Sequence, residues 1–361
     1  LERYETLKNL NEESTYKDLK HLLQDSDKKY NSGLFNLIDD PTIKIDIGSK
    51  ALLSIIKELY YPQSPYTFSV IDASVLGDIY ELFLAHQIII DARGEVAVTE
   101  KPEVKASGGI VTTPKYIVDS IVERALTPAT KGKSPEELAT IHIADICCGS
   151  GVFLLSAYDH LLNYHLDWYV QDGATKYRGT DIYEAGNREW RLTLHRKREI
   201  LLNSIFGVDI DDQAVEVARF SLLLKLIEDE SNESIITHLS QYQERALPTL
   251  DDHIKCGNSL VDHRQFQKYS ENPSDDLLDK INPFDWKDEF SSIFEKGGFD
   301  VIIGNPPYIR IQNMVEYSPE EVKFYQSSAS GYTCAESDNF DKYSLFIERA
   351  VSLLRTAGAL G

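Results

Sequence analysis

Apolar residues along the first hundred positions recur at helical spacing. Three stretches show an apolar face with a period of three to four residues, which predicts helices over 16–23, Ser49–Tyr60 and Asp72–Gln87. Weak alternation over Ala92–Lys105, about Arg93-Gly94, favours a short hairpin. We therefore expect residues 1–105 to form a mainly helical domain.

From Ile110 onward, short apolar runs alternate with helical stretches. The runs predict strands over Ile141–Cys147, Ile205–Val208, Ile254–Lys255 and Val301–Ile303, and another apolar strand begins within Ala357–Gly361. The stretches predict helices over Pro114–Leu126, Phe153–Leu166 and Asp212–Ile227. Such alternation predicts a mostly parallel sheet with helices on both faces. We therefore expect an α/β core over residues 106–361, with its ligand beyond the carboxyl ends of the strands.

Length and composition narrow the class of protein. A chain of 361 residues fits two or three domains, and 42% hydrophobic with 26% charged residues is ordinary globular usage. No apolar run reaches the roughly 18 residues of a membrane span, and no secretory segment opens the chain, so we expect no membrane association. The cysteines form no CxxC pair, which favours reduced thiols in a cytoplasmic protein over a disulfide framework or a metal site. They are Cys147, Cys148, Cys256 and Cys334.

The net charge of −21 argues against nucleic-acid binding by the chain as a whole, because phosphate contacts need Lys and Arg. A local basic face, or a DNA-reading domain elsewhere, would remove this objection. One basic run is present, from Arg188 to Arg198, and it suits either such a face or an ordinary solvated helix.

The first motif, Asp145 to Phe153, lies where an apolar strand turns into a helix. Gly149 and Gly151 allow a tight turn and a close approach of the backbone to a ligand. The segment lacks both the Gly-x-Gly-x-x-Gly spacing of a dinucleotide site and the Gly-Lys-Ser/Thr of a phosphate loop. We therefore expect the ligand to be a nucleoside without phosphates.

The second motif, Phe206 to Asp211, ends another apolar strand on an acid. A carboxylate at the end of the second strand can accept hydrogen bonds from both ribose hydroxyls. Asp209 directly follows the apolar run and is our candidate for that role. Asp211 and Asp212 suit a helix N-cap better.

The third motif, Phe299 to Tyr308, is the most informative. A buried strand runs into Asn305-Pro306-Pro307-Tyr308, and the two prolines predict a rigid turn. An amide side chain and a nearby carbonyl can accept both protons of an exocyclic amine, which directs the nitrogen lone pair at a methyl sulfonium. Tyr308 can stack on a flat base. The motif therefore predicts a planar, amine-bearing substrate.

In this order, the motifs resemble the γ class of amino-methylating DNA methyltransferases, and within it the type IIG restriction–modification enzymes. The resemblance extends from Gly108 to the end, includes Asp341–Phe346 after the catalytic turn, and is looser over Gly77–Glu81. It implies a Rossmann-like, class I S-adenosylmethionine-dependent methyltransferase core. The family's last strands and target-recognition domain are absent, so we expect a truncated core.

The resemblance assigns site residues by position. Thr113 and Pro114 would lie over the methionine part of S-adenosylmethionine, Asp145 would hold its amino group, and Asn258 would meet its adenine. The full implied cofactor set is Thr113, Pro114, Asp145, Cys147, Gly149, Gly151, Phe153, Asp209, Ile210 and Asn258. The implied catalytic set is Asn305, Pro306, Pro307 and Tyr308. No metal is implied.

The implied activity is methyl transfer to the N6 amine of a flipped-out adenine in double-stranded DNA, within a restriction–modification or phage-defence system. Flipping costs about a few kcal/mol. No covalent cysteine is implied, because a cytosine-C5 enzyme needs a Pro-Cys pair that this sequence lacks. A restriction or specificity domain in the same chain or complex is the implied partner.

Other activities stay open. Asn-Pro-Pro-Tyr also suits a methyltransferase for a protein glutamine amide or for RNA, although the Thr-Thr-Pro segment favours DNA. A non-catalytic specificity subunit would keep the fold, but intact Asn305, Tyr308 and Asp209 argue against it. A metal-dependent nuclease within the chain is a further alternative, because Asp91 precedes Glu103-Val104-Lys105, although at ordinary spacing and in a hairpin.

Overall fold

The computed structural model describes residues 15–30, 48–59, 63–64, 86–91, 93–100, 113–242, 246–336 and 340–361. The chain divides into two compact units, which are described separately. The first joins Leu1–Val75 with Ile227–Thr249, and the second joins Leu76–Leu226 with Leu250–Gly361. The domain boundary that we place at residues 105–106 stays a prediction.

The described part of the first unit is helical. It contains α2 (Thr15–Tyr30), α3 (Ser49–Glu58) and α11 (Asn232–Tyr242). Leu53 and Ile56 are buried on one face of α3, as its apolar periodicity predicts. The expected helices near 16–23 and 49–60 are thereby confirmed.

A two-stranded hairpin follows in the second unit. Strand β1 (His86–Ile90) pairs antiparallel with β2 (Val96–Glu100). The Asp91 carboxylate closes the turn by accepting from the amides of Arg93 at 2.8 Å and Glu95 at 2.9 Å. The hairpin about Arg93-Gly94 is confirmed, but its first strand precedes Ala92.

One expected helix is wrong at its end. His86 and Gln87 belong to β1, because the Ile-rich run that follows them pairs as a strand. Residues 72–85 of that helix lie outside the described residues. The same holds for the segments 77–81, 101–105 and 108–112, which carry other expectations drawn from the sequence.

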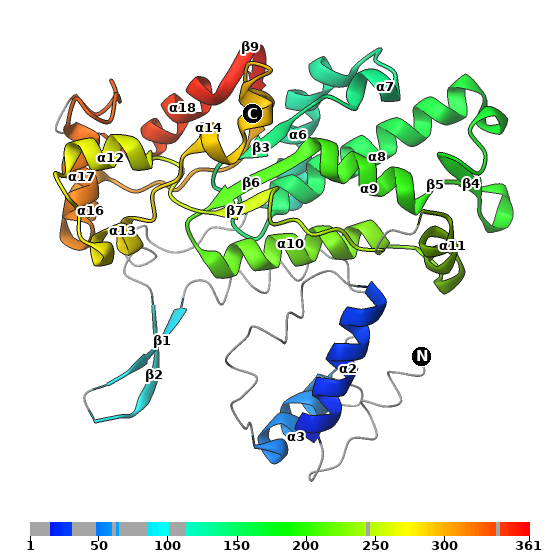
Figure 1. Cartoon of the computed structure of the whole chain (residues 1–361), viewed down its shortest axis with the longest axis horizontal. Coiled ribbons are helices and arrows are strands. Elements are labelled where there is room, and N and C mark those ends of the chain that lie inside the picture. The colour runs from blue at the N-terminus through cyan, green and yellow to red at the C-terminus, as the bar shows by residue number, and fades with distance from the viewer. Residues whose placement is uncertain are drawn as a thin grey trace. The chain divides into compact units, whose positions relative to one another are not determined.

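The centre of the second unit is a five-stranded sheet in the order β7-β6-β3-β8-β9. Figure 1 labels β3, β6, β7 and β9 of this sheet. All neighbouring strands pair in parallel, which confirms the predicted α/β class. The strands are β3 (Ile143–Asp145), β6 (Ile205–Asp209), β7 (Ile254–Cys256), β8 (Phe299–Ile303) and β9 (Leu354–Leu360). The chain leaves β3 toward β6 and returns to β8 on its other side. A crevice for a ligand is expected at such a switch point, beyond the carboxyl ends of the strands.

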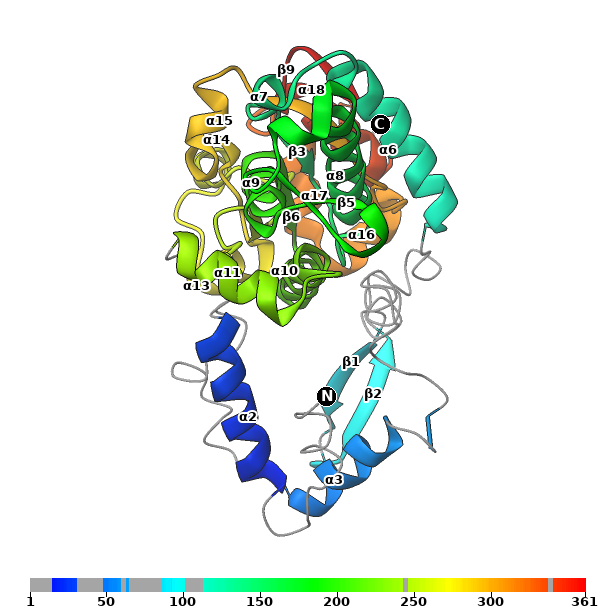
Figure 2. The ribbon, with the colours of Figure 1, turned by 90° about the vertical axis from the view of Figure 1, so that its right-hand side faces the viewer.

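Helices lie on both sides of this sheet (Figure 2). The principal ones are α6 (Lys115–Thr130), α8 (Val152–Gly173), α10 (Asp212–Ile227) and α18 (Lys342–Leu353). Helix α6 packs on α8 and contacts β8 and β9, while α18 contacts β9. The bounds of α10 match the sequence prediction, and α6 and α8 run beyond their predicted ends.

Shorter elements complete the second unit. They are α7 (Pro135–Leu138), η3 (Ala174–Lys176), β4 (Ile182–Glu184), η4 (Gly186–Arg188), β5 (Trp190–Leu192), α9 (Leu194–Ser204), α12 (His263–Tyr269), α13 (Asp275–Ile281), α14 (Trp286–Glu289), α15 (Ser291–Phe294), α16 (Ile311–Tyr317) and α17 (Pro319–Gln326). None of the helices in the described part of the chain is both long and apolar enough to cross a membrane.

The basic run from Arg188 to Arg198 does not form one face. It crosses η4, β5 and the first turns of α9. Arg191 pairs with Glu189 at 3.3 Å, and the Arg196 guanidinium binds Asp181 and also Glu199 at 2.9 Å. Carboxylates of the same chain therefore engage both of these arginines. Only the part of the run that lies on α9 can form the solvated helix face that the sequence suggested.

Candidate functional site

The glycine turn joins β3 to α8. Helix α8 begins at Val152, next to Gly151 with φ of +87°. A Cβ on Gly151 would lie 3.0 Å from Cβ of Ala218 on α10. Glycine is therefore required for both the left-handed backbone and the close packing of two helices.

The carboxylate of Asp145 sits at the start of this turn. It is 1% exposed and accepts a hydrogen bond from the amide of Cys147 at 3.0 Å. Burial, with the nearby Asp209 charge as a lesser cause, raises the pKa of Asp145 from 3.8 to about 7. Such a carboxyl group favours a cationic partner, because a positive charge would offset the loss of hydration.

Asp209 ends β6 and ties that strand to the glycine turn. Its Oδ2 accepts from the amide of Gly149 at 2.8 Å, and its Oδ1 accepts from the amide of Asp211 at 3.0 Å. Burial raises the pKa of Asp209 as well. Asp211 accepts from the amide of Gln213 at 3.0 Å and caps α10, as expected. Ile210, between the two acids, is half exposed.

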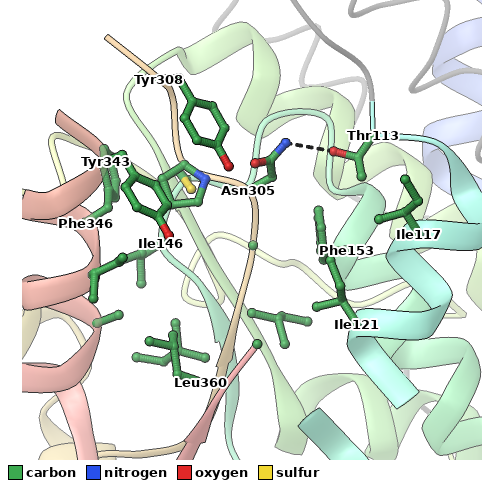
Figure 3. A pocket seen from close by; sticks show the side chains of 18 of the residues that line it. Thr113, Ile117, Ile121, Ile146, Phe153, Asn305, Tyr308, Tyr343, Phe346 and Leu360 are labelled. Carbon is green, nitrogen blue, oxygen red and sulfur yellow. Dashed lines mark hydrogen bonds between the residues drawn. The ribbon is translucent and has the colours of Figure 1, made fainter. Parts of the chain in front are cut away.

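The turn after β8 starts at Gly304, which touches the end of β3. A Cβ on Gly304 would lie 2.6 Å from Oδ1 of Asp145. The next side chain, Asn305, is exposed, and its Nδ2 donates to Oγ1 of Thr113 at 2.9 Å (Figure 3). Thr113 lies two residues before the start of α6, so this hydrogen bond joins two segments that are 192 residues apart.

Tyr308 stacks on a second tyrosine that the motif analysis assigned no role. The rings of Tyr308 and Tyr343 are 5.2 Å apart with planes 13° from parallel. Tyr343 lies in the first turn of α18, and the amide of Lys342 donates to the Ile309 carbonyl at 2.9 Å. Tyr308 remains 67% exposed, so its other face is open. An aromatic residue just before the apolar face of the helix after the turn is the signal that points to Tyr343.

A pocket of about 480 Å³ opens between α6, the glycine turn, the β8 turn and α18. Its volume lies within the range of small-molecule sites. It brings together seven of the residues singled out from the sequence: Thr113, Pro114, Cys147, Phe153, Asn305, Pro306 and Tyr308. Further walls include Ile117, Ile146, Tyr343 and Phe346. No lysine or arginine is among the described residues that line it.

The other expected site residues lie outside the pocket lining. Asp145, Gly149 and Gly151 belong to the end of β3 and the turn beside the pocket, Asp209 and Ile210 lie at the end of β6, and Pro307 lies within the β8 turn. The roles that the resemblance assigns to all of these residues stay predictions.

Asn258 is buried in a separate polar cluster. Its Oδ1 accepts from the amide of Leu260 at 3.1 Å, and its Nδ2 donates to Glu321 at 3.2 Å. Glu321 also accepts from Lys342 at 3.1 Å and from the hydroxyl of Tyr325. The amide of Asn258 is therefore engaged within the protein, and its expected contact with adenine stays a prediction.

Comparison with known proteins agrees with the resemblance. Residues 203–361 match the family described as Eco57I restriction-modification methylase. The chain is 38% identical to the type II restriction enzyme and methyltransferase RM.Eco57I of Escherichia coli. This alignment covers 100% of the chain and 33% of the relative. It is 29% identical, over 56% of its length, to 15% of the adenine-specific methyltransferase PglX of Streptomyces coelicolor.

Among solved structures, the type IIL restriction-modification enzyme MmeI in complex with DNA aligns with 94% of this chain and 43% of its own, at 14% identity and a TM-score of 0.49. The chain spans a third or less of the length of the two sequence relatives named above. The predicted resemblance to restriction–modification methyltransferases is confirmed.

Proposed function

We propose that this chain is the catalytic region of a DNA methyltransferase that transfers a methyl group from S-adenosylmethionine to the N6 amine of adenine in a restriction–modification system. The observation that carries the proposal is the end of β8, which holds an amide and an open tyrosine ring beside the buried Asp145. The names of the relatives, an adenine-specific methyltransferase among them, support it.

The acidic turn suits S-adenosylmethionine. Asp145 would offer a carboxylate to the ammonium group of the methionine part. Burial raises the pKa of this carboxyl group, and a cationic partner would favour its ionised form. Asp209 would accept hydrogen bonds from ribose hydroxyls in addition to those from the amides of Gly149 and Asp211, since a carboxylate can accept about four. The described lining holds no cation for a phosphate, as a phosphate-free cofactor requires. When bound, the cofactor supplies an electrophilic methyl group on a sulfonium.

The β8 turn suits an aromatic amine. Oδ1 of Asn305 and the carbonyl of Pro306 would each accept a hydrogen bond from one N–H of the adenine amine, which directs the nitrogen lone pair toward the methyl group. The nitrogen–methyl bond would form as the sulfur–methyl bond breaks, with S-adenosylhomocysteine as the leaving group, and the methylated amine would then lose one proton to solvent. The prolines restrict the backbone around Asn305, so little reorganisation accompanies this binding. Catalysis then comes mainly from holding the two reactants in line.

Tyr308 would stack on the adenine with the ring face that Tyr343 leaves open. Adenine in a duplex is buried in the base stack, so the base must be flipped out before it reaches this ring. Tyr343 supports Tyr308 from behind and lies at the pocket wall.

The cysteines of the glycine turn do not suit covalent catalysis. Burial raises the pKa of both the Cys147 and the Cys148 thiols, which disfavours the nucleophilic thiolate. Direct displacement at the methyl group needs no such nucleophile.

Double-stranded DNA is the proposed partner, and its backbone contacts would come mainly from elsewhere in the protein or complex. The chain carries a net charge of −21, and Arg191 and Arg196 already pair with carboxylates. A restriction or specificity domain would supply the basic surface. For a nuclease, Asp91 gives no support, because its carboxylate holds the hairpin turn. Glu103-Val104-Lys105 lies outside the described residues.

The test uses the full-length protein, S-adenosylmethionine with a labelled methyl group and duplex DNA of mixed sequence. We expect N6-methyladenine in the nuclease digest by mass spectrometry, with far less from the Asn305→Ala variant in the same reaction time. Label in RNA or in protein glutamine, with DNA unlabelled, would overturn the proposal in favour of those substrates.

A further inference from the structure

The amide of Asn305 has two chemically opposite ends. Its oxygen accepts hydrogen bonds, and its NH2 group only donates them. The proposed reaction needs the oxygen to face the substrate, because the amine of adenine brings protons and needs an acceptor. An amide turned by half a rotation would present donors to that amine and repel it. Methyl transfer therefore depends on which way this amide points.

In the structure, the hydroxyl of Thr113 accepts a hydrogen bond from the donor end of this amide. The distance from Nδ2 of Asn305 to Oγ1 of Thr113 is 2.9 Å. Figure 3 shows the amide nitrogen facing Thr113 and the oxygen facing the side of the pocket where Tyr308 lies. The hydrogen bond thus occupies the donor end of the amide and leaves the acceptor end to the substrate.

Both partners are held by their backbones. Thr113 directly precedes Pro114, whose carbonyl accepts the first bonds of α6, from the amide of Ile117 at 2.8 Å. Val118 and Val122 anchor that helix in the core. Asn305 is held between Gly304 and Pro306, so the rotation of its amide is the main freedom that remains.

We propose that Thr113 is a positioning residue for the methyl acceptor: its hydroxyl holds the Asn305 amide with the oxygen toward the adenine amine. This role is distinct from the cofactor contact that the resemblance implies for Thr113, and it rests on the proposed function. Thr113 acts through Asn305 and touches neither the base nor the transferred methyl group.

Two substitutions of the full-length protein separate the hydroxyl from the shape of the side chain. Thr113→Val keeps the volume and removes the hydroxyl, and Thr113→Ser keeps the hydroxyl. We expect Thr113→Val to lower the single-turnover rate at saturating S-adenosylmethionine about tenfold, the effect of one hydrogen bond of ordinary strength. We expect Thr113→Ser to restore most of the rate.

The background variant Asn305→Asp sharpens the test. A carboxylate presents an acceptor oxygen at either end, so its orientation no longer matters. In this background Thr113→Val should change the rate by less than about twofold, whereas additive effects would be expected for two independent contacts.

A binding measurement gives a second readout. We compare the affinity of each variant for a duplex with adenine at the methylated position and for one with purine, which lacks the amine. The wild-type protein should prefer adenine, and Thr113→Val should lose that preference while Thr113→Ser keeps it.

The proposal is wrong if Thr113→Val only weakens S-adenosylmethionine binding in calorimetry, with the rate at saturation and the adenine preference unchanged. Equal losses in the Asn305 and Asn305→Asp backgrounds would also refute it. Failure of the proposed function has another signature, because the wild-type protein itself would then leave adenine in DNA unmethylated.

Discussion

Two groups of residues lie along the same edge of the sheet in opposite surroundings. On the proposed cofactor side, Asp145 is buried and Gly149 and Asp209 are partly buried, and turn amides donate hydrogen bonds to both carboxylates. The acceptor side, Asn305 and Tyr308, is exposed, and Tyr308 shows 67% of its surface. The cofactor side is held in place by hydrogen bonds within the protein, whereas the acceptor side presents side chains that the proposed DNA partner would cover.

The difference follows from the proposed ligands. S-adenosylmethionine is small and would be enclosed by the protein itself. Partial or full burial of Asp145 and Asp209 would strengthen their electrostatic attraction for its positive charge. A flipped adenine arrives attached to DNA, and the DNA covers the acceptor groups when it binds. Each prediction below tests one of the two sides or the packing beside them.

Near the acceptor side, Glu321 and Lys342 form a buried ion pair. It links the cluster around Asn258 to the helix that carries Tyr343. Replacing Lys342 by Met leaves Glu321 buried without its cation, which should lower the free energy of unfolding by about 3–5 kcal/mol. Urea denaturation measures this.

The neighbouring pair of Lys323 and Glu320 is a matched control. Its nitrogen–oxygen distance is 2.7 Å, but both side chains are exposed. Lys323→Met should leave the denaturation midpoint unchanged, because exposed pairs contribute little. Equal midpoints for the two methionine variants would show that the buried pair contributes no more to stability than the exposed pair.

On the acceptor side, Asn305→Ala removes the oxygen that we propose accepts a hydrogen bond from the adenine amine in the transition state. The turnover number should fall about 10²–10³-fold, as for the loss of one preorganised polar contact. Affinity for S-adenosylmethionine in calorimetry should stay the same, since the cofactor side does not use this amide. Weakened cofactor binding would mean that the two sides are not separable.

On the cofactor side, Asp209→Ala should weaken S-adenosylmethionine binding about 10- to 100-fold, as expected for hydrogen bonds to a charged group. Asp211→Ala is the control, because Asp211 caps α10 and its backbone amide stays in place. Calorimetry should show near wild-type affinity for that control. A loss as large as that of Asp209→Ala would reassign the effect to the turn as a whole.

The smallest predicted effect is a pH dependence. Burial raises the pKa of Asp145 from 3.8 to about 7, so this group is mostly neutral at pH 5.5 and half ionised near pH 7. Since the ionised form attracts an ammonium group, affinity for S-adenosylmethionine should rise about tenfold from pH 5.5 to 7. Asp145→Asn should flatten this profile.

The same shift has the opposite sign for folding without ligand. The folded state favours the neutral carboxyl, so its contribution to stability is greatest below the ordinary carboxyl pKa and falls as the pH rises through about 7. Thermal unfolding with and without cofactor separates the two trends. Parallel trends would mean that the ammonium group is not held by Asp145.

The strands and the ends of their motifs could be predicted from the sequence, because each motif follows an apolar run and parallel strands bring their carboxyl ends together. Helix α10 could be placed because its acidic cap and apolar face adjoin each other in sequence. The stacking of Tyr343 on Tyr308 and the pairing of Glu321 with Lys342 could not, since they join separate elements through tertiary packing. The inward turn of Asn258 belongs to the same class, because sequence position does not tell which way an amide points.

Gly304 has a consequence for sorting related sequences. The space that its missing side chain leaves is filled by Oδ1 of Asp145, so even alanine at this position would push that carboxylate away. A homologue that keeps Asn-Pro-Pro-Tyr intact but has lost this glycine should therefore be counted among decayed genes, unless the residue at position 145 has changed with it. Positions 145 and 304 would then evolve as a pair. An inactive homologue could be recognised from the loss of Gly304, a residue that takes no part in the chemistry.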